Sequence, residues 1–163
     1  MPAFHAALAQ GADVFARDSR DRCSPLVVAA MNGEVRMVDT LLARGADVSQ
    51  RCQSGYDALH VATVGQHIPV VHRLLQAGAS PLSLAPDHFT PIHRAVLMKD
   101  VSRSVELLRT LLDFAGRQSA WRESVQSTEM RHKKSLATPL HSAVTKKNRE
   151  VSASLASFCD FAL

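Results

Sequence analysis

The chain has 163 residues, which fits one domain at the usual size of about 100–200 residues. Apolar residues make up 46% and charged residues 21%, so a buried core is expected and disorder of most of the chain is disfavoured. The net charge of +4 arises after residue 116: residues 1–116 carry 11 basic against 11 acidic residues, and residues 117–163 carry 8 against 4.

The composition and sequence pattern also disfavour other classes. Aromatic residues make up 5% of the chain, which favours packing of helices over a β-sandwich. No run approaches the roughly 18 apolar residues of a membrane span, and the N-terminus lacks the basic segment of a signal peptide. The three cysteines, Cys23, Cys52 and Cys159, are far apart and form no CxxC pair. We therefore expect neither a disulfide nor a zinc site, and an intracellular location in the cytoplasm or nucleus.

Two motifs recur along the chain with a common period. The first appears as SPLVVAA from Ser24, DALHVAT from Asp57, TPIHRAV from Thr90 and TPLHSAV from Thr138. Its first two steps are equal, at about 33 residues each, and its last step is longer by roughly half that length. The second motif appears as LLARGAD at 41–47 and LLQAGAS at 74–80, with an earlier copy, ALAQGAD, at 7–13 and degraded copies at 111–117 and 155–161. A fixed period of this length is typical of repeat architectures.

Each unit predicts two short helices and a turn. The first helix follows Pro25, Pro91 or Pro139, residues suited to a first helical turn. The second helix ends at Gly45 or Gly78, because glycine accepts the left-handed conformation that closes a helix. The predicted apolar positions are Leu26, Ala29 and Ala30, then Met37, Val38, Leu41 and Leu42, then Leu59 and Ala62, then Val70, Val71, Leu74 and Leu75, then Ile92, Ala95 and Val96, and finally Leu140, Ala143 and Val144.

These motifs resemble the ankyrin repeat family, whose unit has the same period and bears T-P-L-H-x-A and L-L-x-x-G-A-D. The resemblance implies an all-α solenoid of paired antiparallel helices with β-hairpin or loop tips, which buries its apolar faces between neighbouring repeats. We expect a single ankyrin repeat domain over residues 1–163. It would comprise a half repeat at 1–18, repeats at about 20–50, 53–84, 86–116 and 136–163, and an inserted basic loop at 117–134.

This sequence departs from the family pattern at several places. Val27 replaces the histidine in the first copy, and Asp57 and Ala58 replace Thr-Pro in the second. The third copy contains about four extra residues near KDVSRSVELL and about eleven more before Thr138. The ends carry no polar capping repeat, from which we expect a longer array or a partner that covers them.

Three histidines share one repeat position, and their spacing argues against catalysis. His60, His93 and His141 fall one repeat apart, so they cannot converge on one ion or substrate. The family resemblance implies that each hydrogen-bonds within its turn and to the next repeat. His67 and His72 are five residues apart and are expected to be solvated. No phosphate loop, HExxH or GxSxG motif occurs, so we predict no enzyme activity, cofactor or metal.

The family resemblance further implies that partners bind at the hairpin tips and the ends of the first helices. By alignment, the candidate contact residues are Arg20, Asp21, Met31, Asn32, Gln53, Tyr56, Val64, Phe89, Leu97, Met98, Lys134 and Lys146, and Cys23 falls at the same kind of position. The middle of this set is apolar and its last copy is basic. We therefore expect a protein or peptide partner with an apolar anchor and an acidic flank, with no nucleic acid or membrane.

The predicted function is a non-catalytic interaction module or scaffold that binds a protein or peptide on its concave face. Two alternatives remain open at this point. The chain could recruit substrates for a larger complex such as a ubiquitin ligase, or it could regulate an enzyme whose catalytic domain lies outside these residues. The basic segment 117–134, with its Trp121, is either a solvated loop or a contact arm.

Overall fold

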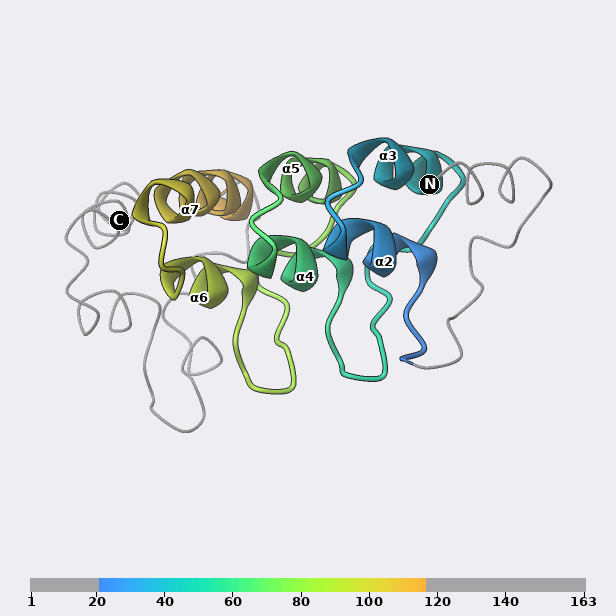
Figure 1. Cartoon of the computed structure of the whole chain (residues 1–163), viewed down its shortest axis with the longest axis horizontal. Helices are drawn as coiled ribbons and strands as arrows, with labels where there is room; N and C mark the ends of the chain where they lie inside the picture. Colours follow the sequence, from blue (N-terminus) through green and yellow to red (C-terminus); the bar gives the residue numbers. More distant parts are fainter. Residues whose placement is uncertain (1–20, 117–163) are drawn as a thin grey trace. The chain divides into compact units, whose positions relative to one another are not determined.

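The computed structural model of the chain describes residues 21–116. The half repeat at 1–18, the basic segment 117–134 and the repeat at 136–163 lie outside the described residues. Six helices are described, as Figure 1 shows: α2 (Pro25–Met31), α3 (Val35–Ala43), α4 (Ala58–Val64), α5 (Ile68–Gln76), α6 (Pro91–Val96) and α7 (Val101–Gly116). The first helices of successive pairs begin one full period apart, and so do the second helices. The period predicted from the sequence is therefore the period of the helices.

The described residues form two compact units, divided after Ala79. In the first unit, residues 21–79, α2 and α4 pack side by side in one layer and α3 and α5 in another, and each first helix packs on its own second helix. In the second unit, from residue 80, α6 packs on α7. The expected all-α class of helix pairs is confirmed in both units. Whether residues 1–163 form a single domain stays a prediction.

The core of the first unit consists of the apolar positions that the repeat predicted. All of them are buried except Leu42, which is half-buried; the buried set is Leu26, Ala29, Ala30, Met37, Val38, Leu41, Leu59, Ala62, Val70, Val71, Leu74 and Leu75. Burying a leucine or valine side chain stabilises a fold by about 1.5–3 kcal/mol. Because α2–α5 have only seven or nine residues, they are too short to be stable alone and depend on this packing.

The helices of the first unit end in the same hydrogen-bonded turn. At the end of α3, the N–H of Ala46 donates to the carbonyl of Leu41 (3.0 Å) and the N–H of Gly45 donates to that of Leu42 (3.0 Å), which is a Schellman motif. The residue in the left-handed conformation is Gly45 here, with φ 82°. The same pair of bonds ends α2, α4 and α5. The glycine positions read from the sequence as helix ends are thus confirmed for α3 and α5.

The hairpin tips are turns with little regular strand. In the tip at 51–57, the N–H of Cys52 donates to the carbonyl of Tyr56 (3.0 Å), and Arg51 forms an isolated antiparallel bridge with Asp57. The tip at 85–89 repeats this bond between Ala85 and Phe89 (3.0 Å). Among residues 21–116, no strand pairing longer than this single bridge is present. The expected hairpin tips are therefore observed as loops, each closed by a backbone hydrogen bond.

Helix α7 differs from the other second helices in length. It has 16 residues, whereas α3 and α5 have nine, yet it begins at the repeat position of their first residues. Leu107 and Leu108, both buried, occupy the positions of the Leu-Leu pairs in α3 and α5. The repeat alignment in the sequence analysis had placed Leu111 and Leu112 at this position. The extra residues of the third copy therefore extend the C-terminal end of α7, where Leu111 and Leu112 add a second buried pair.

Candidate functional site

Exposed apolar side chains gather on the first helices of the repeats. The exposed large hydrophobic residues among 21–116 are Val28, Met31, Val64 and Leu97. Met31, Val64 and Leu97 lie one period apart and are 54%, 58% and 39% exposed. Single apolar residues on a surface are ordinary. Their recurrence at one repeat position is the feature that indicates an interaction surface.

The geometry of a short helix explains why these positions are exposed. In α2, Leu26, Ala29 and Ala30 face the core. Val28 and Met31, three residues apart, lie together on another side of the helix. In α4 the corresponding residues are Val61, which is half-buried, and Val64, which is exposed. We call these four residues, Val28, Met31, Val61 and Val64, the apolar face of the first unit.

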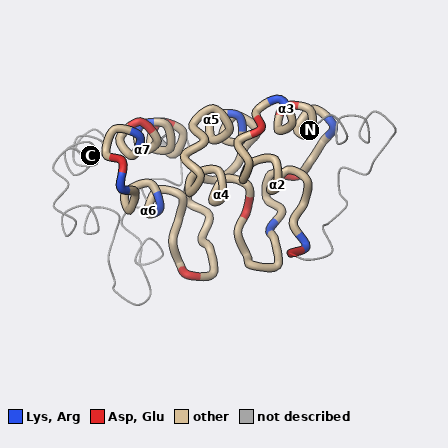
Figure 2. Tube along the Cα trace, in the orientation of Figure 1, with Lys and Arg blue, Asp and Glu red and all other residues tan. Residues whose placement is uncertain are grey.

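Charge is absent from both helices that carry the apolar face. Neither α2 nor α4 contains a lysine, arginine, aspartate or glutamate, as Figure 2 shows by their uniform tan colour. Within the four helices of the first unit, the charged residues lie on α3 and α5 instead. Arg73 Nε on α5 is 3.3 Å from Asp39 Oδ1 on α3. The two layers of the first unit therefore differ in chemistry.

Polar candidates from the sequence analysis lie in the tips and directly after α2. Asp21, Asn32 and Gln53 are exposed, and the amide of Gln53 donates to the carbonyl of Asp21 (2.9 Å). Tyr56 is half-buried, and its ring meets His60 edge-on at 6.0 Å between centroids. Tyr56 therefore helps to hold its tip while part of its ring stays accessible.

In the second unit, the candidate aromatic residue belongs to a polar and aromatic cluster. Phe89 is half-buried, its ring centroid lies 5.8 Å from that of His93, and the guanidinium of Arg94 lies 5.1 Å from the Phe89 ring. Arg94 also forms an ion pair with Asp87. Phe89 thus makes an edge contact with His93 and a cation–π contact with Arg94.

Met98 was expected to be exposed, and this expectation is wrong. Its side chain is 9% exposed and counts among the core residues. Met98 follows the C-cap residue of α6, Leu97, and its N–H donates to the carbonyl of Ala95 (3.3 Å). Alignment with Gly65 had suggested a surface position, but a methionine there folds inward. The candidates Arg20, Lys134 and Lys146 lie outside the described residues.

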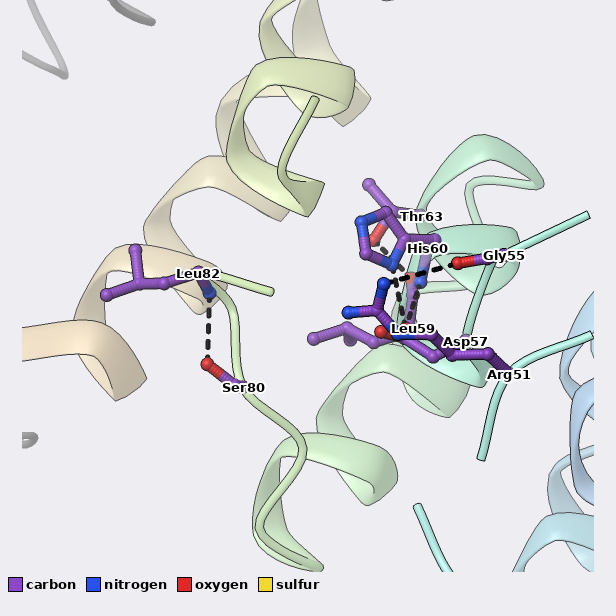
Figure 3. Close-up of polar contacts among 8 residues, drawn as sticks. All are labelled: Arg51, Gly55, Asp57, Leu59, His60, Thr63, Ser80 and Leu82. Atoms are coloured by element: carbon purple, nitrogen blue, oxygen red, sulfur yellow. Dashed lines mark hydrogen bonds and ion pairs between the residues drawn. The ribbon is translucent and has the colours of Figure 1, made fainter. Parts of the chain in front are cut away.

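The repeated histidines are part of the scaffold in both described copies. His60 and His93 have no exposed surface, and Val27 occupies the same buried position in the first copy. The Asp57 carboxylate lies 2.9 Å from His60 Nδ1 and accepts the backbone N–H of His60 (3.0 Å); Figure 3 shows this pair at the start of α4. In α6, Thr90 Oγ1 lies 2.8 Å from His93 Nδ1. Each histidine thus closes its own turn, as the resemblance implied; His141 lies outside the described residues.

His67 was expected to be solvated, but it joins two repeats. It is half-buried, and its Nε2 lies 3.1 Å from the carbonyl oxygen of Met31 in the preceding repeat. A Cβ built on Gly33 would come within 2.5 Å of the His67 ring, so the absence of a side chain at Gly33 makes room for the imidazole. His72 is exposed, as expected. His67 therefore supports the end of α2 directly behind the apolar face.

The expectation of no disulfide is also wrong. Cys23 and Cys52 are joined by an S–S bond of 1.98 Å, with 4.3 Å between their Cα atoms. Their separation of 29 residues is four short of the period, and the hairpin explains the difference. Cys52 pairs with Tyr56 across the tip, and Cys23 lies one full period before Tyr56. The expected reducing location rested on unpaired cysteines, so it loses that support.

Sequence reasoning missed Val28 and Val61. Both precede a chosen candidate by three residues, the spacing that places two side chains on one side of a helix. That signal was present in the sequence. In the described part of the chain, no group of three or more His, Cys, Asp or Glu residues is arranged to hold a metal ion. None of the helices between residues 21 and 116 combines the length and apolar character that a bilayer crossing requires.

Comparison with known proteins agrees with this geometry. Residues 2–85 and 26–118 match the sequence profile of the ankyrin repeats (3 copies). An ankyrin repeat protein of fowlpox virus (strain NVSL) is 29% identical over 144 residues, which is 87% of this chain and 39% of the viral protein. The mouse B-cell lymphoma 3 protein homolog is 40% identical over 72 residues, 44% of this chain and 16% of that protein.

A human relative also matches most of the chain. SH3 and multiple ankyrin repeat domains protein 1 is 31% identical over 133 residues, 79% of this chain and 6% of its own length. The chain therefore spans 39% or less of the length of each of these relatives. The matched profile covers residues 2–118, which include every helix pair described above. On this profile and these helix pairs, the chain belongs to the ankyrin repeat family.

Proposed function

We propose that the chain binds a protein or peptide partner through the apolar face of its first unit. Ankyrin repeats are protein–protein interaction modules and are generally non-catalytic. The observation that carries the proposal is the recurrence of exposed Met31 and Val64 at one repeat position on two adjacent, uncharged helices. An apolar surface of this kind gains free energy when a partner removes it from water.

The surroundings of the apolar face favour a specific contact. Asn32 provides an exposed polar group next to Met31, Asp21 and Gln53 provide exposed polar groups in the tips, and Tyr56 adds a partly accessible aromatic ring. A central apolar cluster with a polar rim is the usual arrangement of a protein-binding hot spot. The partner we propose inserts an apolar anchor against Met31 and Val64 and hydrogen-bonds to the rim.

Phe89 and Leu97 of the second unit are proposed as a further contact set. Leu97 is exposed at the repeat position of Met31 and Val64, and Phe89 is at that of Tyr56. The acidic flank of the partner was inferred from Lys134 and Lys146 and remains part of the proposal. The roles of adaptor or scaffold, an intracellular location and a non-catalytic role of the whole protein are likewise parts of the proposal.

The test is a selection of binding peptides from a random library displayed on phage, with the full 163-residue chain as the target. Enriched peptides are then measured against Met31→Asp/Val64→Asp, which places two charges on the apolar face. We expect Kd to rise at least about tenfold, since loss of one hot-spot contact costs about 1–2 kcal/mol or more. The expected peptides contain an aromatic or aliphatic anchor.

The control variant is Arg36→Asp/Gln76→Asp, which changes two exposed residues on α3 and α5. It should bind the peptides with unchanged Kd, and both variants should keep the helical circular dichroism of the parent. If the library yields no binder, or if the α3/α5 variant loses binding while the Met31/Val64 variant keeps it, the proposal is wrong.

A further inference from the structure

The disulfide links two neighbouring tips. Cys23 belongs to the first tip, of which the structure describes residues 21–24 before α2, and Cys52 belongs to the second tip, residues 51–57. The described link between these tips also includes one backbone hydrogen bond, from the N–H of Gln53 to the carbonyl of Asp21 (2.9 Å). The two links are close in sequence, because Cys23 is two residues after Asp21 and Cys52 is one residue before Gln53.

The position of Cys23 within the repeat connects the disulfide to the candidate binding residues. Cys23, Tyr56 and Phe89 are spaced by one period, so the cysteine occupies the place of an aromatic ring in the other two tips. Cys52 in turn donates its N–H to the carbonyl of Tyr56. The state of the disulfide therefore bears directly on the tip that presents Tyr56.

The two cysteine residues differ in exposure. Cys23 is half-buried, whereas Cys52 is 7% exposed. Thiol–disulfide exchange requires that a thiolate reach one sulfur along the S–S axis, and the accessible sulfur is attacked first. Cys23 is therefore the sulfur that reacts with solvent thiols, and Cys52 is the one that leaves and later closes the bond again.

We propose that Cys23 and Cys52 form a reversible redox link that fixes the second tip against the first and thereby controls partner binding. The consequence for binding rests on the function proposed above; the redox link itself does not. The co-reactant is a low-molecular-weight thiol–disulfide couple of the glutathione type. Reduction frees the second tip to move. The Gln53–Asp21 hydrogen bond is then the described contact between the tips.

The exchange balances in two steps. A small thiolate attacks Sγ of Cys23, the S–S bond breaks, and Cys52 leaves as a thiolate that takes up a proton. A second small thiolate attacks the small-molecule sulfur of the mixed disulfide, which forms the small disulfide and releases Cys23 as a thiolate that is also protonated. In sum, the protein disulfide gains two electrons and two protons, and two small thiols become one small disulfide. Oxidation is the reverse sequence.

The first test uses the full chain alone, equilibrated in buffers with different ratios of reduced to oxidised glutathione. Peptide-resolved mass spectrometry after alkylation distinguishes Cys23, Cys52 and Cys159. We expect Cys23 and Cys52 to become alkylated together as the fraction of reduced glutathione rises. Cys52→Ala should retain one glutathionyl group on Cys23, and Cys23→Ala should be modified at Cys52 at least about tenfold more slowly.

The second measurement is amide hydrogen exchange in the oxidised and reduced chains. Reduction should lower the protection of the Gln53 amide at least about tenfold, because that amide bonds across the two tips. The Ala85 amide is the internal control: it makes the bond equivalent to that of Cys52, in a tip without a disulfide, and its protection should not change. Oxidation should also raise the melting temperature by about 5–15 °C, and Cys23→Ala/Cys52→Ala should abolish that difference.

The outcomes separate the redox link from the proposed function. The inference is overturned if the pair does not form, if it pairs with Cys159, if it stays oxidised in reduced glutathione, or if Gln53 protection does not respond. Peptides selected as above should change Kd at least about threefold between the oxidised and reduced chains. An unchanged Kd with a working redox link would reject its control of binding, whereas a failed peptide selection would reject only the proposed function.

Discussion

At residue 66 the backbone takes a left-handed conformation that side chains with a Cβ rarely adopt. Gln66 has φ 60° and ends α4 at the position that Gly33 holds after α2 with φ 73°. A non-glycine residue in this region stores about 1 kcal/mol of strain or more. The other two turns of this type in the first unit, after α3 and α5, also use glycine. Gln66 is therefore a strained member of an otherwise glycine-based set.

Replacement of this glutamine should stabilise the protein. We expect Gln66→Gly to raise the free energy of unfolding by about 0.5–1 kcal/mol, since relief of strain exceeds the added freedom of the unfolded chain. Urea denaturation followed by circular dichroism measures the change. Gln66→Ala serves as the control, because it keeps the strain and should give no gain. The reverse change, Gly33→Ala, should destabilise, since its Cβ would meet the His67 ring.

Asp47, in the loop after α3, gives a pH-dependent contribution to stability. The Ser49 hydroxyl donates to its carboxylate (2.7 Å), as does the Ser49 backbone N–H (2.8 Å). These bonds, the hydroxyl first, lower the pKa of Asp47 below its ordinary value of 3.8. A lowered pKa in the folded state means that the stabilisation is present above pH 3.8 and is lost as the pH falls through the folded value.

The expected result is a difference between the parent chain and Asp47→Ala that depends on pH. Their melting temperatures should differ by a constant amount above about pH 5, and the difference should shrink below it. Ser49→Ala should produce the same pattern at smaller size, because the backbone donor remains. A gap in melting temperature that widens with acid would contradict this account.

The N-cap residue of the first helix differs among the three described repeats, and so does its hydrogen bonding. Thr90 caps α6, since its Oγ1 accepts the N–H of His93 (3.3 Å) and also meets the His93 ring. Asp57 does the same for α4 with His60. Ser24, at the equivalent place before α2, makes no side-chain cap, and its buried Oγ has no partner among the described residues. The loss of the histidine in the first copy accompanies the loss of the cap.

This difference predicts unequal costs for the same substitution. Thr90→Ala should lower the free energy of unfolding by about 1–2 kcal/mol, because a cap is lost and a buried imidazole loses its hydroxyl partner. Ser24→Ala should be close to neutral, since no hydrogen bond is broken there. Thr90→Ser, which keeps the hydroxyl, should recover most of the loss. Chemical denaturation of the three variants tests this, and equal costs for Thr90→Ala and Ser24→Ala would refute it.

At the scale of the whole molecule, the repeat period determines most of what could be predicted. The period places helices, their ends and their buried positions, because each of these depends on local sequence and on the neighbouring repeat. The prediction therefore held for α2–α6 and for the repeated histidines His60 and His93. It was less accurate for α7, where the motif was aligned on Leu111 and Leu112, four residues after the Leu-Leu pair that occupies the repeat position in the structure.

Contacts between neighbouring tips were harder to predict than positions within a repeat. The separation of the cysteines differs from the period, so Cys23 and Cys52 do not share a repeat position. Their pairing can be predicted only from the period and the hairpin register together. His67 was misplaced because its partner is a backbone carbonyl of another repeat. The exposure of Met98 depended on side-chain packing that alignment does not report.

The greater length of α7 determines where its last described residue lies. Seven residues beyond the length of α3 and α5 turn a helix by about 700°, roughly 20° short of two full rotations. Gly116 therefore faces nearly the same direction as the last residue of a nine-residue helix would, but about 10 Å farther along the axis. Five additional residues would instead have turned this position by about 500°, toward another side of the helix. The added length thus moves the position along the helix axis and leaves its rotational phase almost unchanged.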